Sequence, residues 1–383
     1  MSNQPAVLGP DGVARPYIGG QALLEGVMMR SPHCFSAVVR RKSGVLVVRE
    51  QPMADLRRGK LAWPLVRGVA ALVEALKLGS AALRFSAEQF EQDLDEPGAP
   101  EKSPSRGAGP STVALLALPI IALLTSAPED FGVGPKLPSG EGEPKKRFLG
   151  VLSAVFAIGV FVALPQAFAA GASSVLGLNL DVRSVRFQLL TAGAKLAILI
   201  GYMLVIRRIP EIYRVFQYHG AEHKSIYTYE SGQALTLENA RPKTTLHPRC
   251  GTTFIVMVAL VSIFVFSALG PLLPRFGVGK LADNLLFFAF KLPFLPFIAA
   301  LTFELQRLLA RYCTRGPGRI LLWPGFLVQK ITTIEPDDRQ LEVALSALLV
   351  TLEREQQGKS PEFTSERTFD DFSTLTRQSV PAI

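Results

Sequence analysis

Long apolar windows alternate with charged blocks along the second half of the chain. Residues 148–180 and 250–274 contain no charged side chain, and residues 187–206 and 284–303 contain one each. A helix of about 20 residues spans the roughly 30 Å hydrocarbon core of a bilayer, because each residue adds about 1.5 Å. The pattern therefore predicts four transmembrane helices, near residues 148–170, 187–206, 252–274 and 284–304.

A fifth apolar stretch, residues 113–127, has 15 residues and is short for a membrane span. A span there would place the residues before it on the opposite side of the membrane. We therefore favour an interfacial or re-entrant segment, while a fifth span stays open. The flanking residues 88–106 and 129–147 are rich in Gly, Pro, Ser and acidic residues, a composition typical of flexible linkers.

Shorter patterns predict smaller elements outside the bilayer. Residues 35–48 read as two strands around a Lys-Ser-Gly turn. Residues 61–85 and 336–355 carry apolar side chains at helical spacing, so each predicts an amphipathic helix. Such a helix binds the membrane surface or packs against a helix of a partner. For residues 61–85, packing against the protein's own membrane spans explains the pattern equally well. Asp337 or Asp338 is suited to cap the second helix.

Together these patterns predict a mainly α-helical, multi-pass membrane protein with about four transmembrane helices, a small N-terminal β-hairpin region and cytoplasmic amphipathic helices. Its expected organisation, in chain order, is an N-terminal region with a Gly-Gly motif, the hairpin and an amphipathic helix (1–87), a linker (88–147), a first helix pair (148–206), a cytoplasmic segment bearing His, Glu and Cys (207–249), a second helix pair (250–306), and a C-terminal region ending in a loose polar tail (307–383). The Gly-Gly motif, Gly19-Gly20, is expected to form a tight turn or an anion-binding cradle.

Composition and charge agree with a membrane protein and set its expected orientation. The 383 residues are 48% hydrophobic and 19% charged, whereas about 25% of residues are charged in a typical soluble domain. Seven Lys and Arg residues lie in 207–249, and others precede the first span and follow the last. The positive-inside rule therefore places both termini and this segment in the cytoplasm. The expected partners are membrane lipids, and a membrane protein or a second copy of the chain. No nucleic-acid-binding motif is found.

Three of the four histidines lie between the second and third predicted spans. His219 and His223 are four residues apart, so on a helix they share one face, with Glu222 beside them. His247 and Cys250 follow just before the third span, and the membrane holds both ends of this segment close together. Imidazoles and a thiolate are typical ligands of zinc-type sites. We therefore predict that zinc, or another divalent transition metal, is bound by His219, His223, His247 and Cys250.

Residues 219–223 also spell His-x-x-Glu-His, the inverted zinc-protease motif. In that motif the two histidines bind the metal and the glutamate is the general base, so Glu222 is the predicted catalytic residue. A downstream carboxylate completes the motif's site, and Glu230 and Glu238 are candidates for it beside His247 and Cys250. A random match has a probability on the order of a few in a thousand, which is notable without being decisive. The alternative is that these histidines cap helices and bond to the backbone at a polar membrane face.

Two lysines and two prolines interrupt the apolar windows. Lys195 and Lys291 are functional candidates because ionisable residues are rare inside membrane spans. Snorkelling of both side chains to the interface is the favoured explanation. Pro293 and Pro296 are expected to kink the fourth span.

Five blocks of the chain closely resemble the bacterial YqhQ-like family of multi-pass membrane proteins, also described as domain of unknown function 1385. The blocks are YIGGQALLEGVMMRSP (17–32), RVFQYHGAEHKSIYTYE (214–230), LTLENAR (235–241), HPRCGTTF (247–254) and PGFLVQKITTIEPDDRQLEVALSAL (324–348). The resemblance covers most of residues 17–355. It implies that the Gly-Gly, His-x-x-Glu-His and His-Pro-Arg-Cys blocks belong together, that the membrane is the bacterial inner membrane, and that the protein is a metal-dependent enzyme with no assigned reaction.

Two hypotheses about function follow. The first is a metal-dependent, hydrolase-like membrane enzyme of unidentified substrate, in which Glu222 takes a proton from the attacking water. The second is a non-enzymatic membrane scaffold or membrane-protein assembly factor whose His/Cys cluster is structural. A full shell of four protein ligands favours the second, because it leaves no open position on the metal. A transporter is a weaker hypothesis, since four spans without an inverted repeat make a poor pore.

Overall fold

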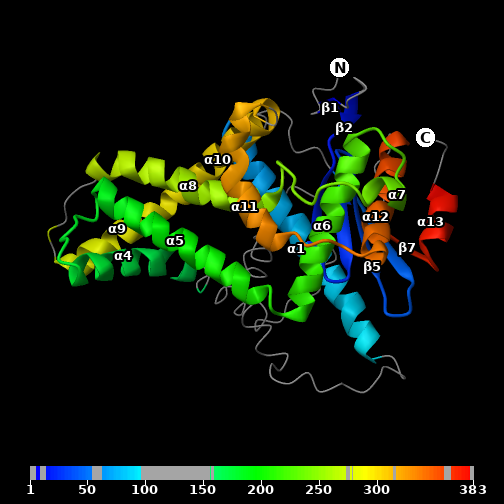
Figure 1. Cartoon of the computed structure of the whole chain (residues 1–383), viewed down its shortest axis with the longest axis horizontal. Helices are drawn as coiled ribbons and strands as arrows, with labels where there is room; N and C mark the ends of the chain where they lie inside the picture. Colours follow the sequence, from blue (N-terminus) through cyan, green and yellow to red (C-terminus); the bar gives the residue numbers. More distant parts are fainter. Residues whose placement is uncertain are drawn as a thin grey trace.

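Apolar helices lie on one side of the molecule, and a mixed sheet-and-helix part lies on the other (Figure 1). The computed structural model describes residues 6–8, 14–53, 63–95, 156, 159–272, 277, 279–313, 316–357 and 364–379. The protein is mainly helical, as predicted, with a small β region near its N-terminus. The predicted segment 113–127 lies outside the described residues.

Among the described residues, three helices are long and apolar enough to cross a membrane. They are α5 (Val185–Ile206), α8 (Gly251–Leu269) and a broken helix spanning Ala282–Ala310. A shorter apolar helix, Gly159–Val175, consists of a π-helical turn η2 (Gly159–Ala163) and α4 (Leu164–Val175). The apolar helices predicted near 187–206, 252–274 and 284–304 are thus confirmed. The first predicted span is seen only as the shorter piece, because most of residues 148–158 lie outside the description.

The broken helix changes geometry at its two prolines. Helix α9 (Lys280–Lys291) passes through one 3-10 turn, η4 (Leu292–Phe294), into α10 (Leu295–Tyr312). Pro293 and Pro296 have no backbone N–H to donate to the preceding turn, so the regular ladder of helical hydrogen bonds stops there. The interruption therefore falls at the two prolines where the sequence predicts a kink. Helices α4, α5, α8, α9 and α10 are called the helical bundle below.

The other part of the molecule, called the globular part below, is built on a five-stranded antiparallel sheet. Its strands, in spatial order, are β3 (Gly19–Leu23), β4 (Gly26–Arg30), β5 (Cys34–Arg40), β6 (Leu46–Pro52) and β7 (Ser365–Phe369). A separate short pair, β1 (Ala6–Leu8) and β2 (Ala14–Pro16), precedes them. The predicted hairpin is confirmed as β5–β6, and Gly44 in its turn has a φ of 96°. The Gly-Gly motif is not a turn, because both of its residues lie in β3.

Helices cover both faces of this sheet, because alternate residues of a strand point to opposite sides. Val27, Val38 and Val48 face α6 (Pro210–Glu230) and α12 (Asp338–Gln356) in one buried cluster. Phe35, Ala37 and Val39 face α1 (Val66–Asp95) in a second cluster. The remaining described helices are α7 (Leu237–Ala240), η3 (Gly270–Leu272), η5 (Pro317–Leu322), α11 (Trp323–Thr332) and α13 (Phe372–Ser379).

Helix α12 confirms the amphipathic helix predicted over residues 336–355. The Asp337 side chain accepts from the Gln340 backbone N–H at 2.8 Å, and the Gln340 side chain accepts from the Asp337 N–H at 2.9 Å. This reciprocal capping box satisfies two backbone donors at the helix start. The apolar face of α12 is buried on the protein's own sheet.

The C-terminal residues correct the expectation of a loose polar tail. Strand β7 pairs with β6, and α13 packs beside α12. Glu50 of β6 is fully buried and accepts hydrogen bonds from Arg354 of α12 and Arg367 of β7. In the sequence this segment resembles a polar tail because it binds through backbone hydrogen bonds to β6 and through ion pairs. Neither kind of contact requires a pattern of apolar residues.

Candidate metal centre

Helix α6 carries the His-x-x-Glu-His motif beside the junction with the helical bundle. Helix α5 ends at Ile206, and Pro210 starts α6 after a three-residue turn, so the two are separate helices. Proline suits the first turn of a helix because its missing N–H would have no partner there. The motif therefore lies on a helix of its own, packed against the sheet.

Three of the four predicted ligands come together. Ligand atoms of His219, His223 and Cys250 all lie within 4.8 Å of one another. The Nε2 atom of His219 is 3.1 Å from the Cys250 sulfur, and the two imidazole centroids are 4.5 Å apart. His223 and Cys250 are buried, whereas His219 is partly exposed. Two imidazoles and a thiol thus share one small volume.

Backbone carbonyls orient both imidazoles. Nδ1 of His219 lies 2.9 Å from the Thr332 carbonyl oxygen, and Nδ1 of His223 bonds to that of Thr245. A carbonyl oxygen only accepts, so each Nδ1 carries the hydrogen and each Nε2 keeps its lone pair. Nε2 of His223 is buried, and no described residue forms a hydrogen bond with it. Proteins orient metal-binding histidines in this way, so these donors fit a divalent transition metal.

Cys250 stands at the start of α8 as its N-cap residue, and its sulfur accepts from the Thr252 N–H at 3.4 Å. Burial raises the pKa of the Cys250 thiol, but His223 and Thr252 outweigh burial, so the pKa is lowered overall. Burial lowers the pKa of both His219 and His223, against the opposing charges of Glu222 and Cys250. Neutral imidazoles and a thiolate are the protonation states that bind a metal.

His247 lies beside the cluster without joining it. Its ring centroid is 5.5 Å from that of His223 and 4.8 Å from that of Tyr227. Its Nδ1 accepts from the Arg249 N–H at 3.4 Å, and its Nε2 lies 3.5 Å from a Glu230 carboxylate oxygen. The hydrogen is therefore on Nε2, the opposite tautomer from the two clustered histidines.

Glu222, the predicted general base, is buried against the sheet. A Cβ atom built on Gly20 would lie 2.7 Å from its Oε1. Burial raises the pKa of Glu222 to about 8, although the charge of His219 works in the opposite direction. The second glycine of the Gly-Gly motif thus faces the glutamate of the His-x-x-Glu-His motif, as the family resemblance implies.

Sequence reasoning missed several residues that hold the centre in place. Gln329 of α11 accepts from the His247 N–H at 2.8 Å, and its amide nitrogen donates to the His247 carbonyl at 2.7 Å. A Cβ atom on Gly220 would collide with the backbone carbonyl of Ile334, so α6 can approach that segment only at a glycine. The buried Lys224 ammonium donates to the Arg241 carbonyl and to Glu335. Only one feature of the sequence pointed to Gln329, Gly220 and Lys224: they lie inside the family-like blocks 214–230 and 324–348.

Comparisons with known proteins support the family that the five sequence blocks indicate. The family described as "Protein of unknown function (DUF1385)" matches residues 63–354. The "Uncharacterized protein YqhQ" of Bacillus subtilis (strain 168) is 30% identical over 351 residues, which cover 90% of this chain and 96% of that protein. No solved structure matches. The matched residues include the whole His/Cys cluster.

Proposed function

The chain belongs to the YqhQ-like DUF1385 family, and we propose that it is a membrane protein with a catalytic divalent-metal centre where its helical bundle meets the globular part. The ligands in this proposal are His219, His223 and Cys250, and the metal is zinc or another divalent transition metal. Glu222 is the general base of a hydrolase-like reaction whose substrate is unidentified.

One observation carries the proposal: two imidazoles, each anchored through Nδ1 on a backbone carbonyl, direct the lone pairs of their Nε2 atoms at one volume shared with a cysteine sulfur. Helix-capping histidines, the alternative reading of the motif, do not require two such anchors converging on a thiol. The anchors fix the tautomer that a metal needs before any metal arrives.

Three protein ligands suit a catalytic site, because a tetrahedral metal then keeps one position open. A metal bound there would act as a Lewis acid on a substrate oxygen or on a water molecule. Glu222 follows His219 by three residues on the same helix, and its side chain lies close against Gly20. Its carboxylate is therefore the proposed acceptor for the proton of the attacking water. The partly exposed His219 marks the side from which a substrate approaches.

His247 takes a supporting role in this proposal. Its ring packs against that of His223. Its Nδ1 accepts from the Arg249 N–H, and its Nε2 faces Glu230 at 3.5 Å without a hydrogen bond to any described residue. Gln329 holds its backbone on both sides and thereby fixes the turn that delivers Cys250.

The second candidate function is an assembly factor or scaffold with a structural metal. The observation that favours it is the number of segments that the cluster joins: α6, the start of α8, the Thr245 backbone and the end of α11. Tying such segments together is what closed structural sites do.

We also propose that the centre faces the cytoplasm of a bacterial cell, with both termini on that side. The support is the seven Lys and Arg residues of 207–249, which adjoin the ends of two apolar helices. Lipids are the surroundings expected for the exposed apolar side chains of the bundle, such as Leu189, Val205 and Phe264.

The experiment has two steps. Elemental mass spectrometry of the purified protein is expected to find about one zinc-type metal per chain, lost in the His219→Ala/His223→Ala variant. Glu222→Gln is then expected to keep the metal and the fold but to fail in complementing a deletion strain, whereas Glu238→Gln, at an exposed position, complements normally. If wild-type protein purified without chelators contains no metal, both candidate functions are contradicted. If Glu222→Gln complements fully, the enzyme is contradicted and the scaffold with a structural metal remains.

A further inference from the structure

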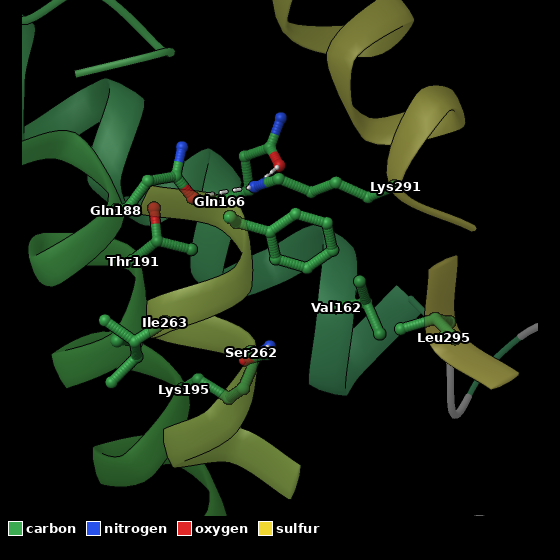
Figure 2. A pocket seen from close by; sticks show the side chains of 11 residues that line it. Val162, Gln166, Gln188, Thr191, Lys195, Ser262, Ile263, Lys291 and Leu295 are labelled. Atoms are coloured by element: carbon green, nitrogen blue, oxygen red, sulfur yellow. Dashed lines mark hydrogen bonds between the residues drawn. The ribbon is translucent and has the colours of Figure 1, made fainter. Parts of the chain in front are cut away.

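The helical bundle contains a small cavity that two lysines share. The cavity measures about 20 Å³ and lies among α4, α5, α8 and the α9–α10 segment. Figure 2 shows Lys195 of α5 and Lys291 of α9 on its wall. Snorkelling to the interface does not describe Lys291, which is 4% exposed and points into the bundle. The metal centre uses neither residue.

The surroundings of Lys291 are arranged to hold an ammonium group. Its Nζ atom donates to the side-chain oxygens of Gln166 at 3.0 Å and Gln188 at 3.1 Å, as drawn in Figure 2. The amide nitrogens of both glutamines donate to backbone carbonyls, at 2.8 Å and 2.5 Å, so their oxygens are left to face the lysine. The rings of Phe266 and Phe287 lie 5.0 Å and 4.6 Å from the same nitrogen, within cation–π range.

Lys195 brings a second donor to the same cavity. Its Nζ atom lies 3.5 Å from the Ser262 hydroxyl oxygen. That hydroxyl donates to the Ala259 carbonyl at 2.6 Å, so it accepts from the lysine. Within the described part of the chain, the two lysine amino groups therefore donate to neutral acceptors only.

The described walls of the cavity provide no negative charge to balance the two lysines. None of the described residues that line the cavity is Asp or Glu. When both lysines are protonated, their two positive charges repel each other and lack the solvation of water. Amide and hydroxyl oxygens partly replace that solvation, but they bring no negative charge. An anion between the lysines would supply it.

Size selects the kind of anion. A cavity of about 20 Å³ admits roughly one occupant of water size. A halide is only slightly larger than water, whereas phosphate and organic acids are several times larger. We propose that the bundle binds one small monovalent anion, of the size of chloride, between Lys195 and Lys291.

The test is direct binding to the full-length protein in lipid nanodiscs. Radioactive chloride is expected to bind saturably at about one ion per chain. Lys195→Gln and Lys291→Gln should each weaken that binding about tenfold or more, because a buried charge loses its partner. Lys330→Gln, at an exposed position of α11, is the matched control and should bind like wild type. The proposal is overturned if chloride does not bind saturably, or if both cavity variants bind chloride as tightly as the wild type does.

A measurement on the wild type keeps the test valid if the cavity variants do not fold. Replacing gluconate by chloride at constant ionic strength should raise the thermal unfolding midpoint, because a ligand of the folded state stabilises it. Bromide should do the same and displace bound chloride. An unchanged midpoint overturns the proposal, and so does displacement of chloride by phosphate, which would show a larger site than the cavity allows.

Discussion

Gly20 of β3 lies against the carboxylate of Glu222 on α6, with room for a hydrogen atom and nothing more. A Cβ atom at Gly20 would lie 2.7 Å from Oε1 and 2.8 Å from both Cγ of Glu222 and the Met29 sulfur. Such distances are far below normal van der Waals contact. The sheet therefore positions the predicted base of the centre through a glycine about 200 residues away in the sequence.

Gly20→Ala should displace the Glu222 side chain while leaving the ligands on α6 and α8 in place. We expect metal content to be retained and complementing activity to fall about tenfold or more, since small misplacements of catalytic groups are costly. Elemental analysis and complementation measure the two effects. Gly19→Ala is the control, because its nearest neighbours lie at 3.5 Å or beyond. Normal activity of Gly20→Ala would show that the position of Glu222 does not matter.

Comparing Cys250→Ser with His247→Gln should distinguish a residue that binds the metal from one that only lies beside it. Loss of the thiolate is expected to lower the zinc affinity at least about tenfold, because a hydroxyl is a poor zinc ligand. His247→Gln is expected to keep about one metal per chain, since its nitrogens face Arg249 and Glu230. Metal titration against a chromophoric chelator gives both affinities, with Cys313→Ser as the control for a free cysteine elsewhere. Equal losses in both variants would make His247 a fourth ligand.

Glu50→Ala should destabilise the globular part strongly. Glu50 is fully buried and pairs with Arg354 and Arg367, so its removal leaves these two guanidinium groups only the weaker contacts with Gln357 and Glu353. The expected loss is about 3 kcal/mol of unfolding free energy. Glu366→Ala, whose carboxylate is 48% exposed beside Arg49, should cost less than about 1 kcal/mol. Denaturant unfolding in detergent compares the two variants, and equal losses would refute the buried pairing.

Acid should destabilise the metal-free protein through His247. Burial lowers the pKa of His247 to about 4, below the value of about 6.5 in an unfolded chain. The unfolded state therefore binds more protons between these values, and stability falls as the pH drops from about 6.5 to 4. The contribution of His247 is up to about 3 kcal/mol, since one pKa unit is 1.36 kcal/mol. His247→Gln should flatten this part of the stability–pH curve, and an unchanged slope would assign the acid sensitivity to other groups.

Patterns that act locally could be predicted from the sequence. Three apolar helices, the β5–β6 hairpin and the Asp337 cap all depend on residues within one turn or one helix. The convergence of His219, His223 and Cys250 was also foreseeable, because helical spacing and two membrane-tethered ends bring them together.

Long-range pairing could not be predicted in the same way. Strand β7 joins β6 across more than 300 residues, through backbone bonds that leave no apolar pattern. The role of Gly20 depends on the depth at which α6 packs on the sheet, and the tautomer of His247 depends on the turn at Arg249. Spacing along a chain reports which residues can meet, but it does not report which ring nitrogen is left free when they do.

The proposed metal centre has a mechanical consequence, because its three proposed ligands belong to two parts of the molecule. Cys250 starts α8, which runs into the helical bundle, whereas His219 and His223 sit on α6, which packs on the sheet. A bilayer of different thickness changes the tilt of membrane helices. Tilting α8 against α6 must alter the distance between the sulfur and the imidazoles. Ion occupancy and bilayer thickness are then thermodynamically linked, so each is expected to shift the other.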